Sequence, residues 1–100
     1  MVNKPKETDM SIFTRYKTIY TPRSNRKITA PAKVIEEVLN AGYNITVASS
    51  GRYATVYSYN KRTHKAEYVS TLSYFISDKI CGYKDGDGCN LRKSNLIFME

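Results

Sequence analysis

The strongest constraint on the fold is a period-two run in the middle of the chain. Residues Tyr53 to Tyr59 read YATVYSY, in which β-branched and aromatic side chains recur at the spacing of a strand. The polar segment from Asn60 to His64 has the composition of a hairpin turn, and a second strand is expected from Lys65 to Val69. Because strands joined by a short turn pair antiparallel, this stretch predicts a β-hairpin within an antiparallel sheet.

One helix is predicted before the hairpin, from Pro31 to Ala41. Thr29 is its expected N-cap, and Gly42 is a residue typical of the position just after a helix. The apolar side chains that share one helix face are Ile35, Val38 and Leu39, with Ala32 behind them. The helix is therefore amphipathic and should pack against the sheet.

The remaining segments are short. Strands are expected at residues 44–49 and 80–83, a strand or tail at 97–99, short helical segments at 71–76 and 90–95, and tight turns at 50–51 and 85–88. Residues 11–20 read as a strand or as an arm that orders on binding, and residues 21–27 as a loop. The predicted fold class is α+β: a small antiparallel sheet with one amphipathic helix.

Length and charge determine the expected domain organisation. One hundred residues with 41% hydrophobic content form one small globular domain. The net charge is +7, and residues 1–30 hold seven of the sixteen Lys and Arg residues but only two of the nine acids. We therefore expect a basic, partly disordered arm at residues 1–28 and a single α+β domain at residues 29–100. This charge favours an anionic partner.

The sequence carries no signature of a membrane, secretory or zinc-binding protein. Residues 1–14 contain no apolar core of a signal peptide, and no apolar run is long enough to span a bilayer. Cys81, Cys89 and the single histidine, His64, are too few for a four-ligand zinc site. We expect a cytoplasmic protein with free thiols, no cofactor and no membrane partner.

The last nineteen residues contain the most specific motif. They read GYKDGDGCNLRKSNLIFME and include the spacing Gly-Asp-x-x-Asn-x-Arg-x-x-Asn-Leu, beginning at Gly86. This pattern resembles the core of HNH endonucleases of the phage and homing type. The resemblance implies a phage or mobile-element origin, hence the host cytoplasm as compartment, and a degenerate ββα C-terminal unit. The residues to which it assigns a structural role are Gly86, Asp87, Asn90, Asn95 and Leu96.

A segment upstream extends the resemblance to residues 51–99. HNH proteins of this type often carry a hairpin with the pattern Gly-Tyr-x-x-Val followed by Tyr-x-Val-His-Arg-Leu. Here the corresponding segments read GRYATV from Gly51 and YVSTL from Tyr68. The His position of that pattern holds Ser70 and the Arg position holds Thr71.

The residues that would perform the family's chemistry are missing. The metal-binding Asp position holds Gly82 and the catalytic His position holds Tyr83, although Asn95 matches the family's metal-binding Asn. These nucleases use a divalent metal and a histidine base that activates water. Tyrosine, with an ordinary pKa of about 10, is a poor base at neutral pH. We expect a protein that is not an enzyme.

Two interpretations of the loop before Asn95 stay open. Asp85, Asp87 and Asn95 together form a non-standard metal site, or the loop is a plain turn that Asn90 and Asn95 hold by side-chain-to-backbone hydrogen bonds. The plain turn is favoured, because the segment departs from the EF-hand pattern at three ligand or glycine positions.

Nucleic acid, with DNA favoured, is the expected partner. Cations would hold phosphates, and Tyr16 and Tyr20 would stack on bases. The residues predicted to contact nucleic acid are Arg15, Lys17, Arg23, Arg26, Lys27, Lys84, Arg92 and Lys93. A solubilising tail is the alternative for the arm residues, and a solvated helix face is the alternative for Arg92 and Lys93.

Three functions follow in order of preference. The first is a non-catalytic DNA-binding module on an HNH-like scaffold. The second is a small phage protein that binds and inhibits a host protein in a host-takeover or anti-defence role, which an exposed apolar or tyrosine surface would support. The third is a residual metal-dependent nuclease. Steep salt dependence of DNA binding would favour the first.

Overall fold

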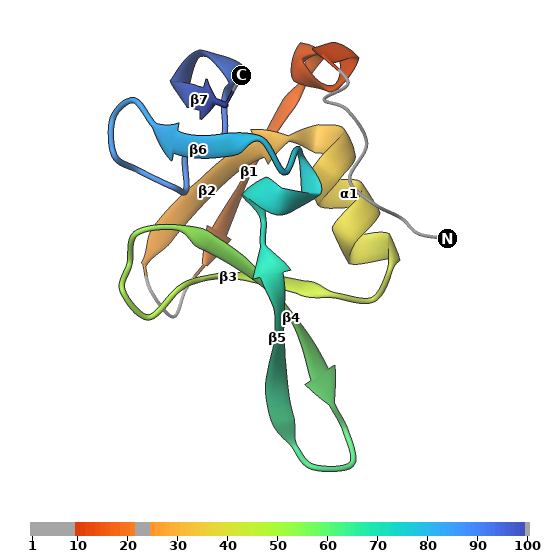
Figure 1. The fold of residues 1–100 in the computed structure, drawn as a ribbon. Helices are drawn as coiled ribbons and strands as arrows, with labels where there is room; N and C mark the ends of the chain where they lie inside the picture. The colour runs from red at the N-terminus through yellow and green to blue at the C-terminus, as the bar shows by residue number, and fades with distance from the viewer. Residues whose placement is uncertain (1–9, 22–24, 100) are drawn as a thin grey trace.

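The computed structural model describes residues 10–21 and 25–99, which form three small antiparallel sheets and one α-helix (Figure 1). The predicted α+β class is confirmed. In the first sheet, β1 (Tyr16–Thr21) pairs with β2 (Arg26–Pro31). The second sheet is the meander of β3 (Asn44–Val47), β4 (Ala54–Asn60) and β5 (Lys65–Thr71). In the third sheet, β6 (Ile80–Tyr83) pairs with β7 (Leu96–Phe98). Turns of 3₁₀ helix lie at Met10–Thr14, Ser73–Phe75 and Lys93–Asn95. Within the described ranges, no helix is long and apolar enough to cross a membrane.

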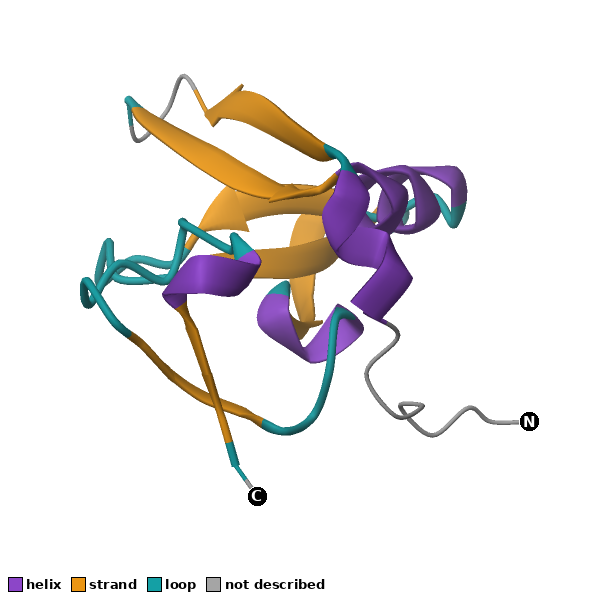
Figure 2. Cartoon of the chain, turned by 90° about the horizontal axis from the view of Figure 1, so that it is seen from above, coloured by secondary structure: helices purple, strands orange, loops and turns teal. Residues whose placement is uncertain are grey.

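The helix α1 (Ala32–Asn40) lies close to its predicted position. Its buried side chains include Val34, Ile35 and Val38, whereas Leu39 is 45% exposed and does not belong to the apolar face, contrary to the prediction. Thr29 does not cap the helix, because it lies inside β2 and bonds Thr18 through their hydroxyl groups (2.8 Å). Seen from above, α1 lies on one side of the strands and the long loops gather on the opposite side (Figure 2).

The segment predicted as a basic arm contributes to the core. Ile28 and Ala30 on β2 are fully buried, so the boundary expected after residue 28 falls within a core strand. The loop predicted at residues 21–27 is shorter, because Thr21 ends β1 and Arg26 begins β2. Residues 1–9 and 22–24 of the predicted arm and loop lie outside the described residues. Pairing with β1 gives β2 hydrogen-bonding partners that local composition does not reveal.

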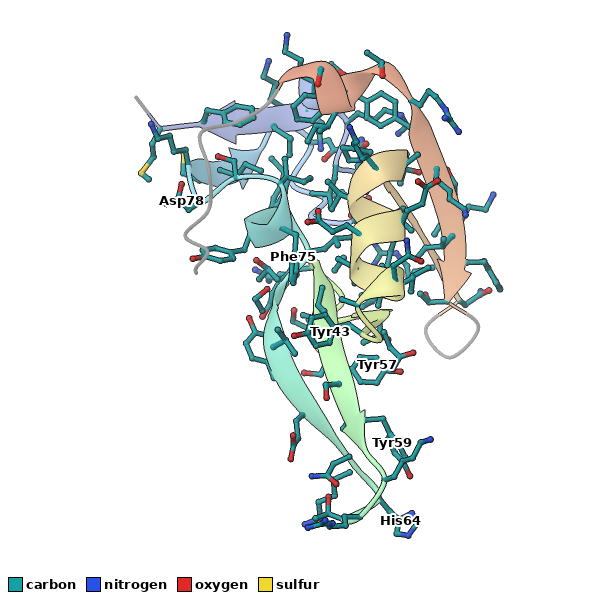
Figure 3. All side chains as sticks on the ribbon, turned by 90° about the vertical axis from the view of Figure 1, so that its right-hand side faces the viewer. Tyr43, Tyr57, Tyr59, His64, Phe75 and Asp78 are labelled. Atoms are coloured by element: carbon teal, nitrogen blue, oxygen red, sulfur yellow. The ribbon has the colours of Figure 1, made fainter. Side chains whose placement is uncertain are left out.

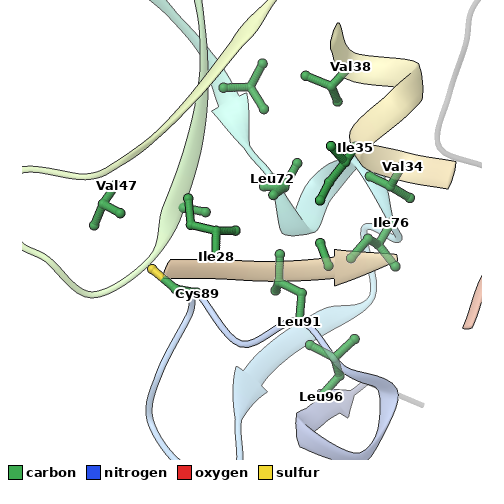
Figure 4. Close-up of a cluster of buried hydrophobic side chains, with 13 residues drawn as sticks. Ile28, Val34, Ile35, Val38, Val47, Leu72, Ile76, Cys89, Leu91 and Leu96 are labelled. Carbon is green, nitrogen blue, oxygen red and sulfur yellow. The ribbon is translucent and has the colours of Figure 1, made fainter. Parts of the chain in front are cut away.

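The C-terminal segment 89–91 packs beside β2. The backbone N–H of Leu91 donates to the Thr29 carbonyl oxygen (2.7 Å), and the Thr29 N–H donates to the carbonyl oxygen of Cys89 (2.9 Å). Leu91 and Cys89 thereby join Ile28 and the α1 side chains in one hydrophobic cluster (Figure 4).

The ββα arrangement expected at the C-terminus is not confirmed. β6 occupies its predicted residues, but only the 3₁₀ turn Lys93–Asn95 stands where the helix was expected, and the chain continues directly into β7. Leu96 is extended and buried in the core, which ends the helical turn after three residues.

Candidate nucleic-acid interface

Side chains of the C-terminal loop hold one another in place. The Asn95 amide nitrogen donates to Asp85 Oδ1 and to the carbonyl oxygen of Asn90, both at 2.9 Å, and its Oδ1 accepts from the Asp85 backbone N–H at 3.0 Å. Asn90 Nδ2 donates to Asp85 Oδ2 at 3.1 Å, and the Asp87 N–H donates to Asp85 Oδ1 at 2.8 Å. Asn95 is 7% exposed, and these bonds close the loop onto the 3₁₀ turn.

Both carboxylate oxygens of Asp85 accept these bonds. The backbone N–H of Asp87, and after it the amides of Asn90 and Asn95, stabilise the charged form and hold the pKa of Asp85 below its ordinary value. A metal ion at Asp85 and Asn95 would have to displace donors that are already in place. Among residues 10–21 and 25–99, no three His, Cys, Asp or Glu side chains group as metal ligands.

Arg26 ties this loop to the rest of the molecule. One guanidinium nitrogen lies 3.0 Å from Asp87 Oδ1, and the other donates to the Gly51 carbonyl oxygen at 2.6 Å. Asp87 Oδ1 also accepts the backbone N–H of Cys89 at 2.9 Å. Arg26 was predicted to contact phosphate, and the structure gives its guanidinium partners within the protein.

The positions at which the HNH pattern would place its catalytic residues hold groups that pack or cap. Tyr83 is half-buried against the core, and a Cβ at Gly82 would meet only the Ile97 side chain, at 3.4 Å. The Ser70 hydroxyl donates to the Thr71 carbonyl oxygen (3.0 Å), and Thr71 Oγ1 accepts the N–H of Tyr74 (3.3 Å).

Three of the predicted cations gather with two tyrosines on one surface. Tyr16 and Tyr20 share a face of β1, and Lys27 on β2 lies directly opposite Tyr20. The Tyr16 hydroxyl accepts the backbone N–H of Lys93 at 3.0 Å, which places Arg92 and Lys93 beside that face. The basic–aromatic face, as we call it, consists of the exposed residues Tyr16, Tyr20, Lys27, Arg92 and Lys93.

The other predicted cations lie elsewhere. Lys17 is on the opposite face of β1, paired with Ala30, and Arg15 borders a hollow together with Lys33 of α1. Lys84 is exposed after β6, and its N–H donates to the Asn95 carbonyl oxygen (2.8 Å). Arg23 lies outside the described residues.

Sequence reasoning missed a second basic and aromatic surface. The distal part of the β4–β5 hairpin carries Lys61, Arg62 and Lys65 at its tip and the exposed Tyr59 and Tyr68 along its strands. The sequence signal is three cations in the predicted turn and its flank, but a polar turn by itself indicates only a connection between strands.

No family model, curated protein or solved structure is significantly similar to this chain.

Proposed function

We propose that the protein binds nucleic acid, with DNA favoured, through phosphate contacts made by the basic–aromatic face, and that it does not cleave it. In this proposal it is an accessory protein of a phage or another mobile element, built on an HNH-like scaffold. The observation that carries the proposal is the clustering of Lys27, Arg92 and Lys93 around Tyr16 and Tyr20.

Phosphate contacts would supply most of the affinity. Lys27, Arg92 and Lys93 are exposed and come from two segments that are far apart in the sequence. Each cation that neutralises a phosphate releases counterions, so binding weakens steeply with salt. The described residues contain one α-helix, and its buried face packs in the core, so base reading by a helix in the major groove has no support here.

The salt dependence of binding tests this face. Replacing Lys27, Arg92 and Lys93 together by alanine should weaken duplex binding and reduce the slope of log K against log salt by up to about three units, near one per lost phosphate contact. The matched control replaces Arg15, Lys17 and Lys33, which removes the same charge near α1. If the control lowers the slope as much as the first triple does, net charge rather than this face governs binding.

The absence of cleavage is tested separately. Gly82 and Tyr83 stand at the family's acid and base positions, and both carboxylate oxygens of Asp85 accept hydrogen bonds within the loop. Plasmid incubated with the protein and Mg²⁺ or Mn²⁺ should show no nicking above a protein-free control. Metal-dependent nicking that disappears in Asn95→Ala would contradict the proposal.

Binding of a host protein is the second candidate. The observation that favours it is the exposure of Tyr59 and Tyr68 on the β4–β5 hairpin, because exposed aromatic surface is typical of protein interfaces. Affinity capture from host lysate, with and without nuclease treatment, separates the two functions. Capture of one host protein that survives nuclease treatment supports the second.

A further inference from the structure

The distal β4–β5 hairpin, residues 57–69, extends from the core as a two-stranded ribbon (Figure 1). Residues 61–69 are all exposed, and the ribbon contributes no side chain to the hydrophobic core. Figure 3 shows Tyr57, Tyr59 and His64 following one another from its base to its tip. A hydrogen-bonded turn closes it, with Asn60 Oδ1 accepting the N–H groups of Arg62 (2.9 Å) and Thr63 (3.3 Å).

The register separates the ribbon into two unlike faces. Tyr57 pairs with Tyr68, and Tyr59 pairs with the small Ala66. Because side chains alternate along a strand, the three tyrosines share one face, which we call the tyrosine face. Tyr59 is 49% exposed and Tyr68 is 67% exposed, so both rings are available to a partner.

The charge of the ribbon favours an anionic partner. It holds three cations, Lys61, Arg62 and Lys65, against one acid, Glu67. Glu67 pairs with Ser58, and Lys65 pairs with Asn60, on the other face, where the Glu67 carboxylate accepts a bond from Asn60 Nδ2 (3.3 Å). Lys61 and Arg62 lie in the turn that joins the two strands. The tyrosine face is therefore free of acidic side chains from its own strands and ends at a basic tip.

We propose that this ribbon binds a single-stranded nucleic-acid segment, whose bases stack on the tyrosine face while the basic tip holds its phosphates. The inference rests on the proposed nucleic-acid function and names its substrate class. Aromatic rings beside cations are the usual platform for unpaired bases, since every base has a flat face to stack.

The spacing of the rings fits this substrate. Alternate residues of a strand lie about 7 Å apart, so Tyr57 and Tyr59 are separated by roughly twice the rise per residue. That separation is also about twice the 3.4 Å rise per nucleotide of one DNA strand, so the spacing of the two tyrosines along the strand matches every second nucleotide.

A duplex fits this face less well. A two-stranded ribbon enters the major groove, but reading base edges there uses guanidinium, amide and carboxylate groups. The tyrosine face presents Tyr57, Tyr59, Tyr68 and Ala66 instead. An apolar protein surface could accept the rings, but it would leave Lys61 and Arg62 at the tip without anionic partners.

The test compares binding of a fluorescein-labelled dT 12-mer and of a 12-base-pair duplex by fluorescence anisotropy, using the full chain. Tyr59→Leu combined with Tyr68→Leu should weaken 12-mer binding about 30-fold or more, as expected for two lost stacked bases, and affect the duplex much less. The double phenylalanine variant keeps both rings and should bind within about twofold of the wild type, since stacking needs no hydroxyl. Tyr74→Leu is the matched control, because Tyr74 is 48% exposed but lies outside the ribbon. Unchanged melting temperatures verify that the variants are folded.

Several results would overturn the inference. The first is a double leucine variant that binds the 12-mer with wild-type affinity, or that loses affinity for the 12-mer and the duplex equally. The second is a double phenylalanine variant that no longer binds the 12-mer. The third is Tyr74→Leu weakening 12-mer binding as much as the double leucine variant does. If the double leucine variant no longer captures a host protein but still binds the 12-mer like the wild type, the ribbon binds a protein partner instead. If the wild type binds neither nucleic acid, the proposed function itself fails. Binding that depends on Lys27, Arg92 and Lys93 but not on the ribbon tyrosines leaves that function standing and removes only this inference.

Discussion

Asn95 carries the clearest structural role among single residues. In the HNH pattern this position serves a metal, whereas here its amide bonds Asp85 and the carbonyl oxygen of Asn90. Because Asn95 is nearly buried, truncation leaves the Asp85 N–H and the Asn90 carbonyl oxygen without these bonds. The side chain thus closes the loop through its own hydrogen bonds.

Asn95→Ala should lower the free energy of unfolding by about 1–3 kcal/mol, because it removes three hydrogen bonds of which one goes to a charged carboxylate. Urea unfolding in metal-free buffer measures this loss, and EDTA should change neither protein. Ser94→Ala, at an exposed neighbouring position, is the control. A wild-type unfolding curve for Asn95→Ala, together with a melting temperature of the wild type that rises with Mg²⁺, would show that the asparagine serves a metal.

Asp85 makes the loop sensitive to acid. Its donors, led by the Asp87 N–H, lower its pKa in the folded state, so its charged form stabilises the fold above the unfolded pKa of about 3.9. That contribution is lost as pH falls through the lower, folded pKa. The stability difference between the wild type and Asp85→Asn should therefore be largest near neutral pH and shrink below about pH 4.

Urea unfolding at neutral and acidic pH measures the difference for Asp85, with Asp78→Asn as a control at an exposed aspartate outside the loop. A difference for Asp85→Asn that does not change on acidification would mean that the ionised carboxylate is not what the loop uses.

At the scale of elements, Gly88 lets the C-terminal loop dock against β4. A Cβ there would lie 2.5 Å from Tyr53 Cβ and 2.6 Å from the Arg52 carbonyl oxygen. The Gly88 N–H donates to that same oxygen at 2.8 Å, so the contact cannot open without losing a bond. Gly88→Ala should destabilise the protein by about 1–3 kcal/mol, the usual cost of overpacking.

Thermal melts compare Gly88→Ala with Gly82→Ala, where a Cβ would meet only a flexible isoleucine side chain, at 3.4 Å. Equal melting temperatures for the two variants would contradict close docking of the loop.

At the scale of the whole molecule, the reactivity of the Cys89 thiol measures whether the hydrophobic core is closed. It is buried, and burial raises the pKa of its thiol, with the nearby Asp87 charge acting in the same direction and Arg26 opposing both. Cys81 is exposed. Because the thiolate is the reactive species, a thiol reagent should label Cys81 rapidly. It should label Cys89 only as fast as the fold opens.

Quantified labelling of the wild type and of Cys81→Ser identifies the two phases. The variant should retain only the slow phase, and denaturant should abolish the difference. Equal rapid labelling of both thiols in native buffer would mean that Cys89 is accessible and that the cluster around it is not closed.

The sequence alone determined the elements whose signals are local. The alternation from Tyr53 to Tyr59 predicted β4, and the apolar spacing before Gly42 predicted α1. The motif containing Asn90 and Asn95 predicted a turn stabilised by side-chain-to-backbone hydrogen bonds. Each signal lies within a few residues and reflects the geometry of one strand, helix or turn. The α+β class followed from these elements.

Tertiary structure decided which distant residues meet. Arg26 binds Asp87 across 61 positions, and Lys93 bonds Tyr16 across 77, so no local period predicts either contact. Long-range pairing also places part of the predicted arm in the core as β2. It brings three of the predicted cations, Lys27, Arg92 and Lys93, to one face. Tertiary packing also explains why a 3₁₀ turn replaces the expected helix, because the buried Leu96 is the first residue of β7. Strand partners and surface neighbours depend on the packing of the whole chain, which local propensity does not encode.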